Sequence, residues 1–294
     1  MNTLVVGYRA VFVLLALHYC ASAMAVLLPV TDVKPATASA NVQLLEPFNI
    51  ADLDRPRHIR LYLPPKYQQS QKRYPVLYLH DGQNVFDDAT AYAGEWGVDE
   101  TLNQLAAQGW LELIVVAIDN GEQHRMQEYS GWDNPRFGKA EGEAYINFIR
   151  NELKPYVDRH FRTLPEAADT GIMVSSMGGL ISHYALFNRP GTFSKAGIFS
   201  PSYWYSEAVY AKTNMQVLPK QSRISLLVGT KEGREMVSNT LKMADLLRSQ
   251  GLANAQLSVK VVPEAEHNEA FWRSEFADAV LYLFNPAAYY LRAR

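Results

Sequence analysis

One segment of the chain combines a serine with small residues in a pattern that suits nucleophilic chemistry. Residues 171–180 read Gly-Ile-Met-Val-Ser-Ser-Met-Gly-Gly-Leu, so an apolar run leads into Ser176 and two glycines follow shortly after it. A sharp turn between a buried strand and a helix lifts a serine above a sheet and leaves little room beside it. The free N–H groups of the following helix would face a reacting carbonyl. The segment therefore predicts Ser176 as the nucleophile of an acyl-transfer reaction.

Val174 departs from the usual form of this turn, which is Gly-x-Ser-x-Gly. A β-branched side chain is expected to fit tightly at the first position. A serine- and glycine-rich turn without chemistry is the alternative interpretation. The other parts of the site must decide between the two.

A serine nucleophile needs a general base, and the histidines that follow Ser176 are His183 and His267. His183 falls in the same predicted helix, where it is expected to face its packing neighbours or solvent. His267 lies between the last predicted strand and the last predicted helix. This is a loop at the carboxyl end of the sheet, where a base is expected. We predict His267 as the base, with a structural loop histidine as the alternative.

The third member of such a site is an acid that orients the imidazole. Glu232 follows a predicted buried strand at its carboxyl end and stands between Ser176 and His267 in the chain, the order expected of this fold. We predict Glu232 as the acid. A solvated loop glutamate is the alternative interpretation, and Glu266 is the second choice for the acid.

An oxyanion hole would complete the site with two backbone N–H donors. The N–H of Met177 is the first, because this residue follows the serine. The second is expected from Gly82 or Gln83, in the loop after an early buried strand. The neighbouring His80 and Asp81 resemble a metal pair, but no further ligands stand at useful spacing, so no metal site is predicted.

Substrate contacts are predicted from residues near these motifs. Arg125 follows a buried strand and would bind an anionic or catecholate group, or would instead pair with Glu128 and order its loop. Aromatic side chains near the motifs would line a cleft for an aryl group, or would belong to the core. Trp96 and Trp204 are the first choices among Phe86, Tyr92, Trp96, Tyr203 and Trp204.

The elements that must position these residues alternate along the chain. Strands are predicted at 41–48, 57–63, 75–79, 111–118, 171–174, 196–199, 224–228 and 256–262, and helices at 96–108, 141–160, 177–187, 237–249 and 269–283. Alternating strands and helices after an antiparallel start imply an α/β fold, with a mostly parallel central sheet and helices on both faces.

Composition is that of an ordinary globular chain. The 294 residues are 48% hydrophobic and 20% charged, with a net charge of -2. No basic stretch suggests nucleic-acid binding. Residues 41–294 are predicted to form a single domain, and the sequence leaves its oligomeric state open.

The first residues have the layout of a secretory signal peptide. Arg9 precedes an apolar run at 10–17, and small residues follow at 21–25. We predict a signal peptide over 1–25, a linker over 26–40 and a periplasmic or secreted protein without stable membrane insertion; a membrane anchor and a lipoprotein signal are the alternatives. Cys20 is the only cysteine, so a cleaved protein could form no disulfide.

Five motifs stand in order along the chain: Tyr78–Phe86, Trp96–Glu100, Ser175–Leu180, Ser200–Trp204 and His267–Trp272. Together they resemble the putative esterase (esterase D-like) family of α/β-hydrolases, which includes siderophore trilactone esterases and feruloyl esterases. The resemblance extends from roughly residue 57 to residue 283.

The resemblance implies an α/β-hydrolase fold, no cofactor and a serine–histidine–acid triad at Ser176, His267 and Glu232. Some siderophore esterases of the family are thought to use a dyad, which leaves the role of Glu232 less defined. The expected function is hydrolysis of small-molecule esters, whether siderophore, aryl or carbohydrate esters. A non-catalytic binding protein and an acyltransferase to a sugar acceptor are the alternatives.

Overall fold

The computed structural model describes residues 34–292. The predicted signal peptide and residues 26–33 of the predicted linker lie outside the described residues. Residues 34–39 form no regular element. They are nevertheless tied to the folded part, since Thr37 N donates to Asp87 Oδ1 at 3.0 Å and Ser39 N donates to Asp99 Oδ2 at 2.6 Å. No helix among the described residues is long and apolar enough to cross a membrane.

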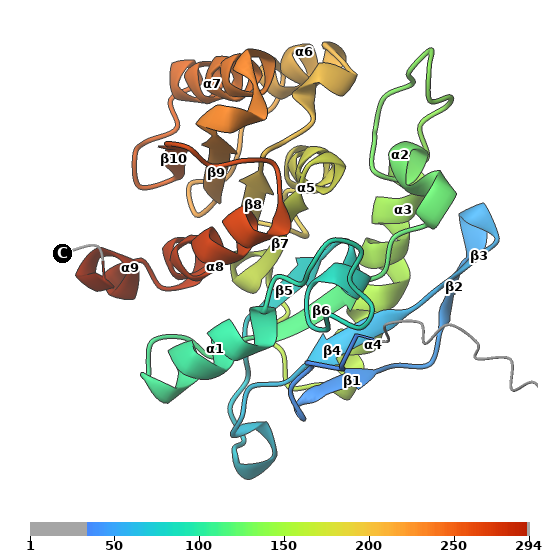
Figure 1. Cartoon of the computed structure of the whole chain (residues 1–294), viewed down its shortest axis with the longest axis vertical. Coiled ribbons are helices and arrows are strands. Elements are labelled where there is room, and N and C mark those ends of the chain that lie inside the picture. Colours follow the sequence, from blue (N-terminus) through green and yellow to red (C-terminus); the bar gives the residue numbers. More distant parts are fainter. Residues whose placement is uncertain (1–33, 293–294) are drawn as a thin grey trace, which may run out of the picture. The chain divides into compact units, whose positions relative to one another are not determined.

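An eight-stranded sheet in the order β1-β4-β6-β5-β7-β8-β9-β10 forms the centre of the fold (Figure 1). The pairs β1/β4 and β4/β6 are antiparallel, and all other pairs are parallel. This confirms the predicted mostly parallel sheet with an antiparallel start. The strands are β1 Val42–Leu44, β4 Ile59–Tyr62, β5 Val76–Leu79, β6 Ile114–Ile118, β7 Thr170–Ser175, β8 Lys195–Phe199, β9 Arg223–Gly229 and β10 Leu257–Val262.

The central strands are apolar on both sides because both faces of the sheet are covered. In β5, Val76 and Tyr78 belong to one hydrophobic core, whereas Leu77 and Leu79 belong to the other. Successive side chains of a strand point to opposite faces, so a continuous apolar run supplies both cores. This is why the sequence shows uninterrupted apolar segments for these strands.

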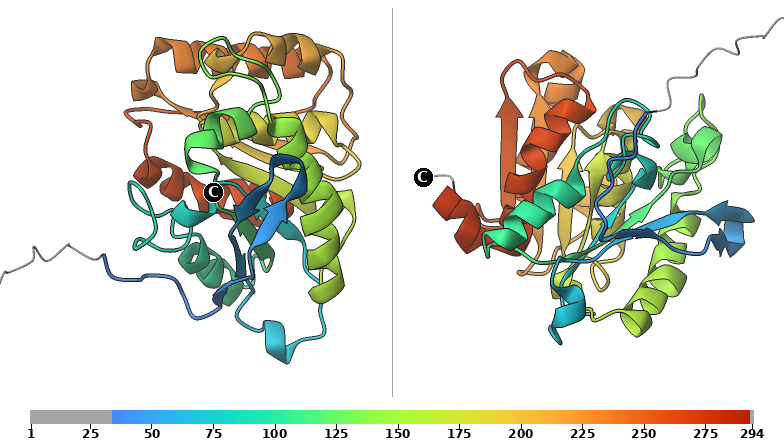
Figure 2. Two further views of the ribbon diagram at one scale, coloured as in Figure 1. Left: turned by 90° about the vertical axis from the view of Figure 1, so that its right-hand side faces the viewer. Right: turned by 60° about the horizontal axis from the view of Figure 1, so that its bottom comes forward.

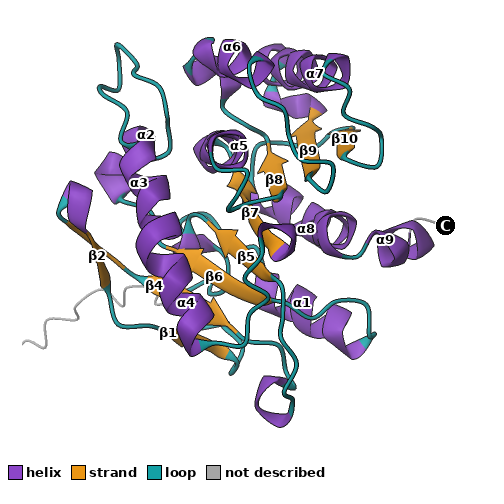
Figure 3. Cartoon of the chain, turned by 180° about the vertical axis from the view of Figure 1, so that it is seen from behind, coloured by secondary structure: helices purple, strands orange, loops and turns teal. Residues whose placement is uncertain are grey.

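Helices supply the outer side of each core. One core takes its helical residues from α3, α4, α5, α6 and α7, and the other from α1, α8 and α9. Figures 2 and 3 show the two helical layers on opposite sides of the strands. The helices are α1 Val98–Ala107, α2 Arg125–Glu128, α3 Gly142–Phe148, α4 Lys154–His160, α5 Met177–Asn188, α6 Ala208–Asn214, α7 Arg234–Ser249, α8 Glu269–Phe284 and α9 Pro286–Arg292.

Several elements differ from the prediction. The helix expected at 141–160 contains a π-helical turn, η5 (Ile149–Leu153), between α3 and α4. Pro155 follows that turn, and a proline ring crowds the carbonyl four residues earlier, which favours local widening. A separate hairpin of β2 (Phe48–Ile50) and β3 (Arg55–Arg57) was not predicted, and neither were α2, α6 and α9.

His183 lies buried in α5, so of the two expected environments, packing neighbours or solvent, the structure shows the first. Its Nδ1 lies 3.0 Å from the Tyr203 hydroxyl and its Nε2 lies 2.7 Å from Thr213 Oγ1. The ring stacks on Phe187 with centroids 4.5 Å apart. Burial lowers the pKa of His183 to about 3. The neutral ring is therefore part of the packing, and neither nitrogen is open to a substrate.

The buried His183 predicts a loss of stability in acid. Between pH 6.5 and about 3 the unfolded chain binds a proton at this histidine and the folded chain does not, so the free energy of unfolding falls as pH falls. The expected slope is about 1.4 kcal/mol per pH unit. Urea midpoints from pH 7 to pH 4 should decrease less steeply in His183→Gln than in the parent. His58→Gln, which changes an exposed histidine, is the control, and equal slopes in all three proteins would contradict the assignment.

Candidate active site

Ser176 occupies the turn between β7 and α5. Its backbone has φ 60° and ψ −126°, a conformation that costs a non-glycine residue about 1–3 kcal/mol. Hydrogen bonds on both sides hold it there: Ser176 N donates to Phe199 O at 2.9 Å, and Ser202 N donates to Ser176 O at 3.1 Å. A strained backbone conformation that neighbouring hydrogen bonds enforce is typical of functional residues. The strand, turn and helix are those that the sequence predicted.

Val174 fits beside this turn because Gly178 has no side chain. A Cβ at residue 178 would lie 1.9 Å from Val174 Cγ1, so the valine occupies the volume that an alanine would need. Gly179 is restricted as well, since a Cβ there would lie 2.9 Å from Phe199 O. The β-branched residue is thus accommodated with 1% of its surface exposed.

Glu232 and His267 form a hydrogen-bonded pair. Glu232 Oε2 lies 2.6 Å from His267 Nδ1, and the glutamate side chain has no exposed surface. Its other oxygen accepts Ser200 Oγ at 2.7 Å and Gly229 N at 2.6 Å. With Nδ1 donating to the carboxylate, Nε2 is the nitrogen of the neutral ring that can accept a proton.

The loops after β9 and β10 meet because Gly229 lets them approach. A Cβ at Gly229 would lie 2.3 Å from Ala265 O, and Lys231 N donates to the same carbonyl oxygen at 2.9 Å. The parallel pairing of β9 with β10 brings both strand ends to one edge of the sheet. The backbone therefore carries Glu232 and His267 to the same place.

Ser200 and Trp272 extend the hydrogen bonding around Glu232, and the sequence indicated no role for either of them. Trp272 Nε1 donates to Ser200 Oγ at 2.9 Å, and Ser200 Oγ in turn donates to Glu232. The Trp272 ring also stands perpendicular to His267, with centroids 4.8 Å apart. Both residues belong to motifs that stood out in the sequence, and that was the available signal.

A cavity of about 510 Å³ brings most of the predicted residues together. Ser176, His267, Gln83, Trp96 and Arg125 all line it. Among the described residues Ser176 Oγ has Ser202 Oγ as its side-chain partner at 3.4 Å, with no hydrogen bond to His267. A serine–histidine bond is often long without substrate and shortens in the complex. The other lining residues are Asp81, Asn84, Tyr92, Asn120, Glu122, Val174, Ser175, Glu269 and Trp272.

The loop that holds Gly82 and Gln83 follows β5. Asp81 has φ 53°, and a Cβ at Gly82 would lie 2.7 Å from Asp119 Oδ1, so this turn needs glycine after the aspartate. Outside the regular helices and strands, no hydrogen bond among the described residues is donated by the backbone amide of Gly82, Gln83 or Met177. Gln83 lines the cavity, whereas Gly82 and Met177 are buried and do not line it.

Arg125 pairs with Asp81. The alternative prediction, an ion pair between Arg125 and Glu128, is wrong. Arg125 Nε and Nη2 donate to the two oxygens of Asp81 at 2.7 and 2.8 Å, while Glu128 binds Arg55 and Arg57. Burial opposes the charge of Arg125, but the Asp81 carboxylate raises its pKa overall. Burial likewise opposes the charge of Asp81, and Arg125 with Asn120 lowers its pKa overall. The pair stays charged and ties α2 to the loop after β5.

The aromatic residues separate into two groups. Trp96 is 2% exposed and stacks on Phe199, with one side on the cavity, and Tyr92 is 92% exposed at its mouth. Phe86 and Tyr203 are core residues. Trp204 is 43% exposed, packs against Phe137 and Tyr205, and does not line the cavity.

His80 lies in the core beside the same loop. Its Nδ1 lies 2.8 Å from the Tyr145 hydroxyl, and burial lowers its pKa to about 3. The ring packs against Tyr129 and Tyr145. His80 is therefore a neutral core residue that supports the loop after β5 through its packing.

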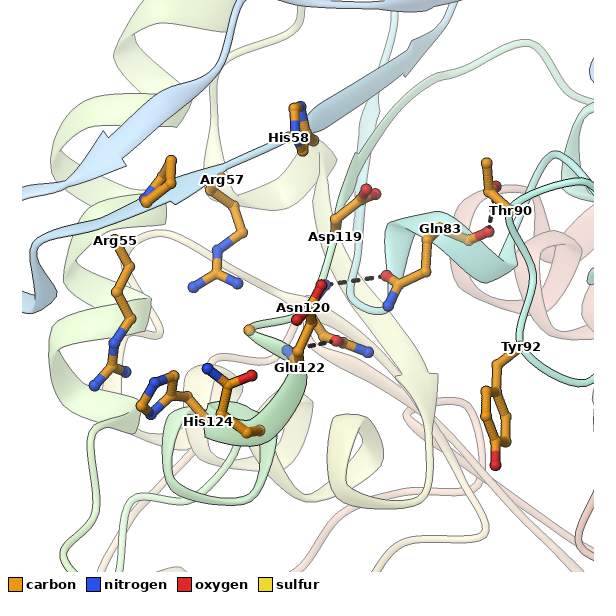
Figure 4. A pocket seen from close by; sticks show the side chains of 13 residues that line it. Arg55, Arg57, His58, Gln83, Thr90, Tyr92, Asp119, Asn120, Glu122 and His124 are labelled. Carbon is orange, nitrogen blue, oxygen red and sulfur yellow. Dashed lines mark hydrogen bonds between the residues drawn. The ribbon is translucent and has the colours of Figure 1, made fainter.

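A second cavity of about 640 Å³ adjoins the first and is shown in Figure 4. Gln83, Tyr92, Asn120 and Glu122 line both cavities, so the two form one extended cleft. Gln83 Oε1 accepts Asn120 N at 3.0 Å at the junction. The remaining lining residues of the second cavity are Arg55, Pro56, Arg57, His58, Thr90, Asp119, Gly121, Gln123 and His124.

The contact between Val174 and residue 178 gives a stability prediction. Gly178→Ala should destabilise the fold by about 1–3 kcal/mol, because the new methyl group would overlap Val174. Adding Val174→Ala should restore part of that loss, and Val174→Ala alone is the control. Urea denaturation of the four proteins measures the coupling, and strictly additive effects would contradict the steric explanation.

Known proteins resemble this chain in sequence and in fold. It is 28% identical over 242 residues to the uncharacterized protein YbbA of Bacillus subtilis, spanning 78% of this chain and 92% of that protein. It is 28% identical over 140 residues to the siderophore triacetylfusarinine C esterase of Aspergillus fumigatus, spanning 45% of each chain. The solved structure of an IroE-like serine hydrolase from Shewanella oneidensis superposes with a TM-score of 0.64 at 21% identity, over 81% of this chain and 80% of that one.

The profile of the Putative esterase family matches residues 50–283, which is most of the chain. The match includes the strained serine, the histidine–glutamate pair and the loop after β5. Family membership supports ester hydrolysis. The chain belongs to the Putative esterase family.

Proposed function

We propose that this chain is a serine esterase that hydrolyses carboxylic esters through an acyl-enzyme. Ser176 is the nucleophile, His267 the general base and Glu232 the acid that orients it. The observation that carries the proposal is the strained Ser176 at a strand-to-helix turn, on the same cavity as a histidine paired at 2.6 Å with a fully buried glutamate. A purely structural turn would need neither the strain nor the buried pair.

The reaction proceeds in two halves. Ser176 Oγ attacks the ester carbonyl while His267 Nε2 takes its proton, and the same nitrogen then gives that proton to the leaving alcohol. A water molecule, activated by His267, attacks the acyl-enzyme, and the carboxylic acid leaves as Ser176 recovers its proton. No other reactant is needed.

Backbone amides stabilise the charge that develops on the carbonyl oxygen. The N–H of Met177 lies at the start of α5, and the second donor comes from the loop after β5. Gln83 is favoured over Gly82 for this role because it lines the cavity. The Asp81–Arg125 pair fixes the loop that carries this amide, and each such donor is worth about 3 kcal/mol in the transition state.

The substrate class follows from the shape of the cleft. Two adjoining cavities suit an ester with a sizeable group on each side of the scissile bond. Tyr92 and Trp96 offer aromatic surface near the serine, and two arginines and two histidines line the second cavity. These features fit siderophore, aryl or carbohydrate esters, and the Aspergillus relative supports the first of these.

Replacing the nucleophile tests the proposal. Ser176→Ala and His267→Ala should each lower kcat for p-nitrophenyl acetate by at least about 10³-fold, because the triad acts as a unit. Ser175→Ala removes the neighbouring hydroxyl of the same cavity and should keep most of the activity. A fluorophosphonate probe should label the parent and Ser175→Ala, but not Ser176→Ala.

Other results of these experiments would support a different function or a different nucleophile. A parent that neither hydrolyses esters nor reacts with the probe would be a binding protein on the esterase fold. Acyl transfer would appear instead as esters of an added sugar among the products. Loss of labelling in Ser175→Ala with labelling kept in Ser176→Ala would refute the choice of nucleophile.

The two-cavity cleft predicts selective effects on large substrates. Gln123→Trp places an indole ring in the second cavity and narrows it, so kcat/KM for an ester with large groups on both sides should fall about tenfold or more. Hydrolysis of p-nitrophenyl acetate should not change, because this ester is small enough for the first cavity. Gln123→Ala is the matched control. An equal effect on both esters would mean that the second cavity takes no part in binding.

A further inference from the structure

Ser200 is a buried serine in a backbone conformation that favours glycine. Its φ is 44°, in the left-handed region, and 0% of its surface is exposed. The residue directly follows β8, and its N–H donates to Leu227 O in β9 at 2.7 Å, which holds it against that strand. Glycine would adopt this conformation more readily than serine does. A serine at such a position indicates that its hydroxyl group has a role.

The hydrogen bonds of Ser200 Oγ have a fixed direction. An indole N–H can only donate, so Trp272 Nε1 donates to Ser200 Oγ at 2.9 Å. A hydroxyl group carries one hydrogen, and Glu232 Oε1 accepts it at 2.7 Å. The other oxygen of Glu232 accepts His267 Nδ1 at 2.6 Å. Three hydrogen bonds therefore connect the indole, the hydroxyl group, the carboxylate and the imidazole.

Trp272 also contacts the imidazole directly. Its ring is perpendicular to the ring of His267, with centroids 4.8 Å apart. The two residues flank the start of α8, where Asn268 Oδ1 accepts Phe271 N at 3.0 Å and Asn268 O accepts Trp272 N at 3.3 Å. The capped first turn of α8 thus fixes the indole relative to the imidazole.

His267 needs this support because its side chain is 38% exposed, whereas that of Glu232 has no exposed surface. Water weakens an exposed ion pair, so the carboxylate alone restrains the imidazole only in part. The carboxylate must itself be held, and Ser200 Oγ and Gly229 N both donate to its Oε1. With Oε1 fixed in this way, Oε2 is left to face His267.

We propose that Ser200 and Trp272 are positioning residues for His267, an inference that rests on the proposed esterase function. Ser200 holds the carboxylate of Glu232, and Trp272 directs the hydroxyl hydrogen of Ser200 to that carboxylate while it confines the imidazole. Neither residue exchanges a proton with the substrate. Together they keep His267 at the cavity that Ser176 also lines.

The first test follows the Nδ1 proton of His267 by proton NMR of the full chain at low temperature. A proton held between an imidazole and a carboxylate resonates far downfield, and its loss in His267→Ala assigns the signal. Ser200→Gly should shift this signal upfield or remove it, and so should Trp272→Phe, which keeps an aromatic ring. Glycine suits φ 44°, so Ser200→Gly removes the hydroxyl group without new backbone strain.

Ser222→Ala is the matched control for the loss of a buried hydroxyl group. Ser222 is 1% exposed, and its Oγ finds no hydrogen-bond partner in the part of the chain that the structure describes. This variant should leave both the Nδ1 signal and the activity unchanged.

Kinetics give the second test. Ser200→Gly should lower kcat for p-nitrophenyl acetate by about 10- to 100-fold, the usual effect of one hydrogen bond to a charged group. KM should not change, because Ser200 does not line the cavity. In a Glu232→Gln background the same change should have little further effect, since Ser200 acts through that carboxylate.

The variant that combines Ser200→Gly with Trp272→Phe separates positioning from stability. It leaves no buried indole N–H without an acceptor, so its urea midpoint should recover relative to Ser200→Gly. Its kcat should stay low, because the carboxylate is still not held. Recovery of kcat together with the urea midpoint would assign the two residues a structural role only and overturn the proposal.

Two further results would also overturn it. One is an Nδ1 signal that is missing in the parent or unchanged in both Ser200→Gly and Trp272→Phe. The other is an unchanged kcat of Ser200→Gly when the parent is active. A parent without esterase activity would refute the proposed function instead, and the Nδ1 signal would still decide whether Ser200 and Trp272 position His267.

Discussion

The buried carboxylate of Glu232 is the constraint on which the rest of the site depends. With no exposed surface, it must obtain its hydrogen bonds from the protein, and it takes them from Ser200, Gly229 and His267. These partners follow β8, end β9 and follow β10, so the parallel register of neighbouring strands is what brings them together. The proposed acid therefore links the architecture of the sheet to the orientation of one imidazole.

Steric exclusion constrains the turn at Ser176, just as hydrogen bonds constrain the side chain of Glu232. Val174 fills the volume beside Gly178, and Gly179 lets α5 approach Phe199, so the turn is closed to side chains on two sides. The backbone of Ser176 is held in a strained conformation by bonds to neighbouring segments. Strain of this kind persists only where the surroundings leave no alternative, and the packing of β7, β8 and α5 provides such surroundings.

Charge pairs organise the other side of the cleft. Asp81 and Arg125 remain charged because each offsets the burial of the other, and together they fix the loop that carries Gln83. At the junction of the two cavities, Asn120 and Gln83 are hydrogen-bonded to each other and line both. The cleft thus combines an ion-paired loop near Ser176 with polar, partly exposed residues further out.

The sequence by itself determined the alternation of strands and helices and the strand–turn–helix at Ser176, and it pointed to the proposed order of serine, acid and histidine, since these follow from local patterns. Only the tertiary structure decided which residues form ion pairs with each other and which of them line the cavity. Arg125 binds Asp81, 44 residues away, and not its near neighbour Glu128, and Trp204 lies outside the cavity that Trp96 lines. Spacing along the chain specifies which residues share an element, whereas the choice of partner depends on distance and burial in space, which packing alone sets.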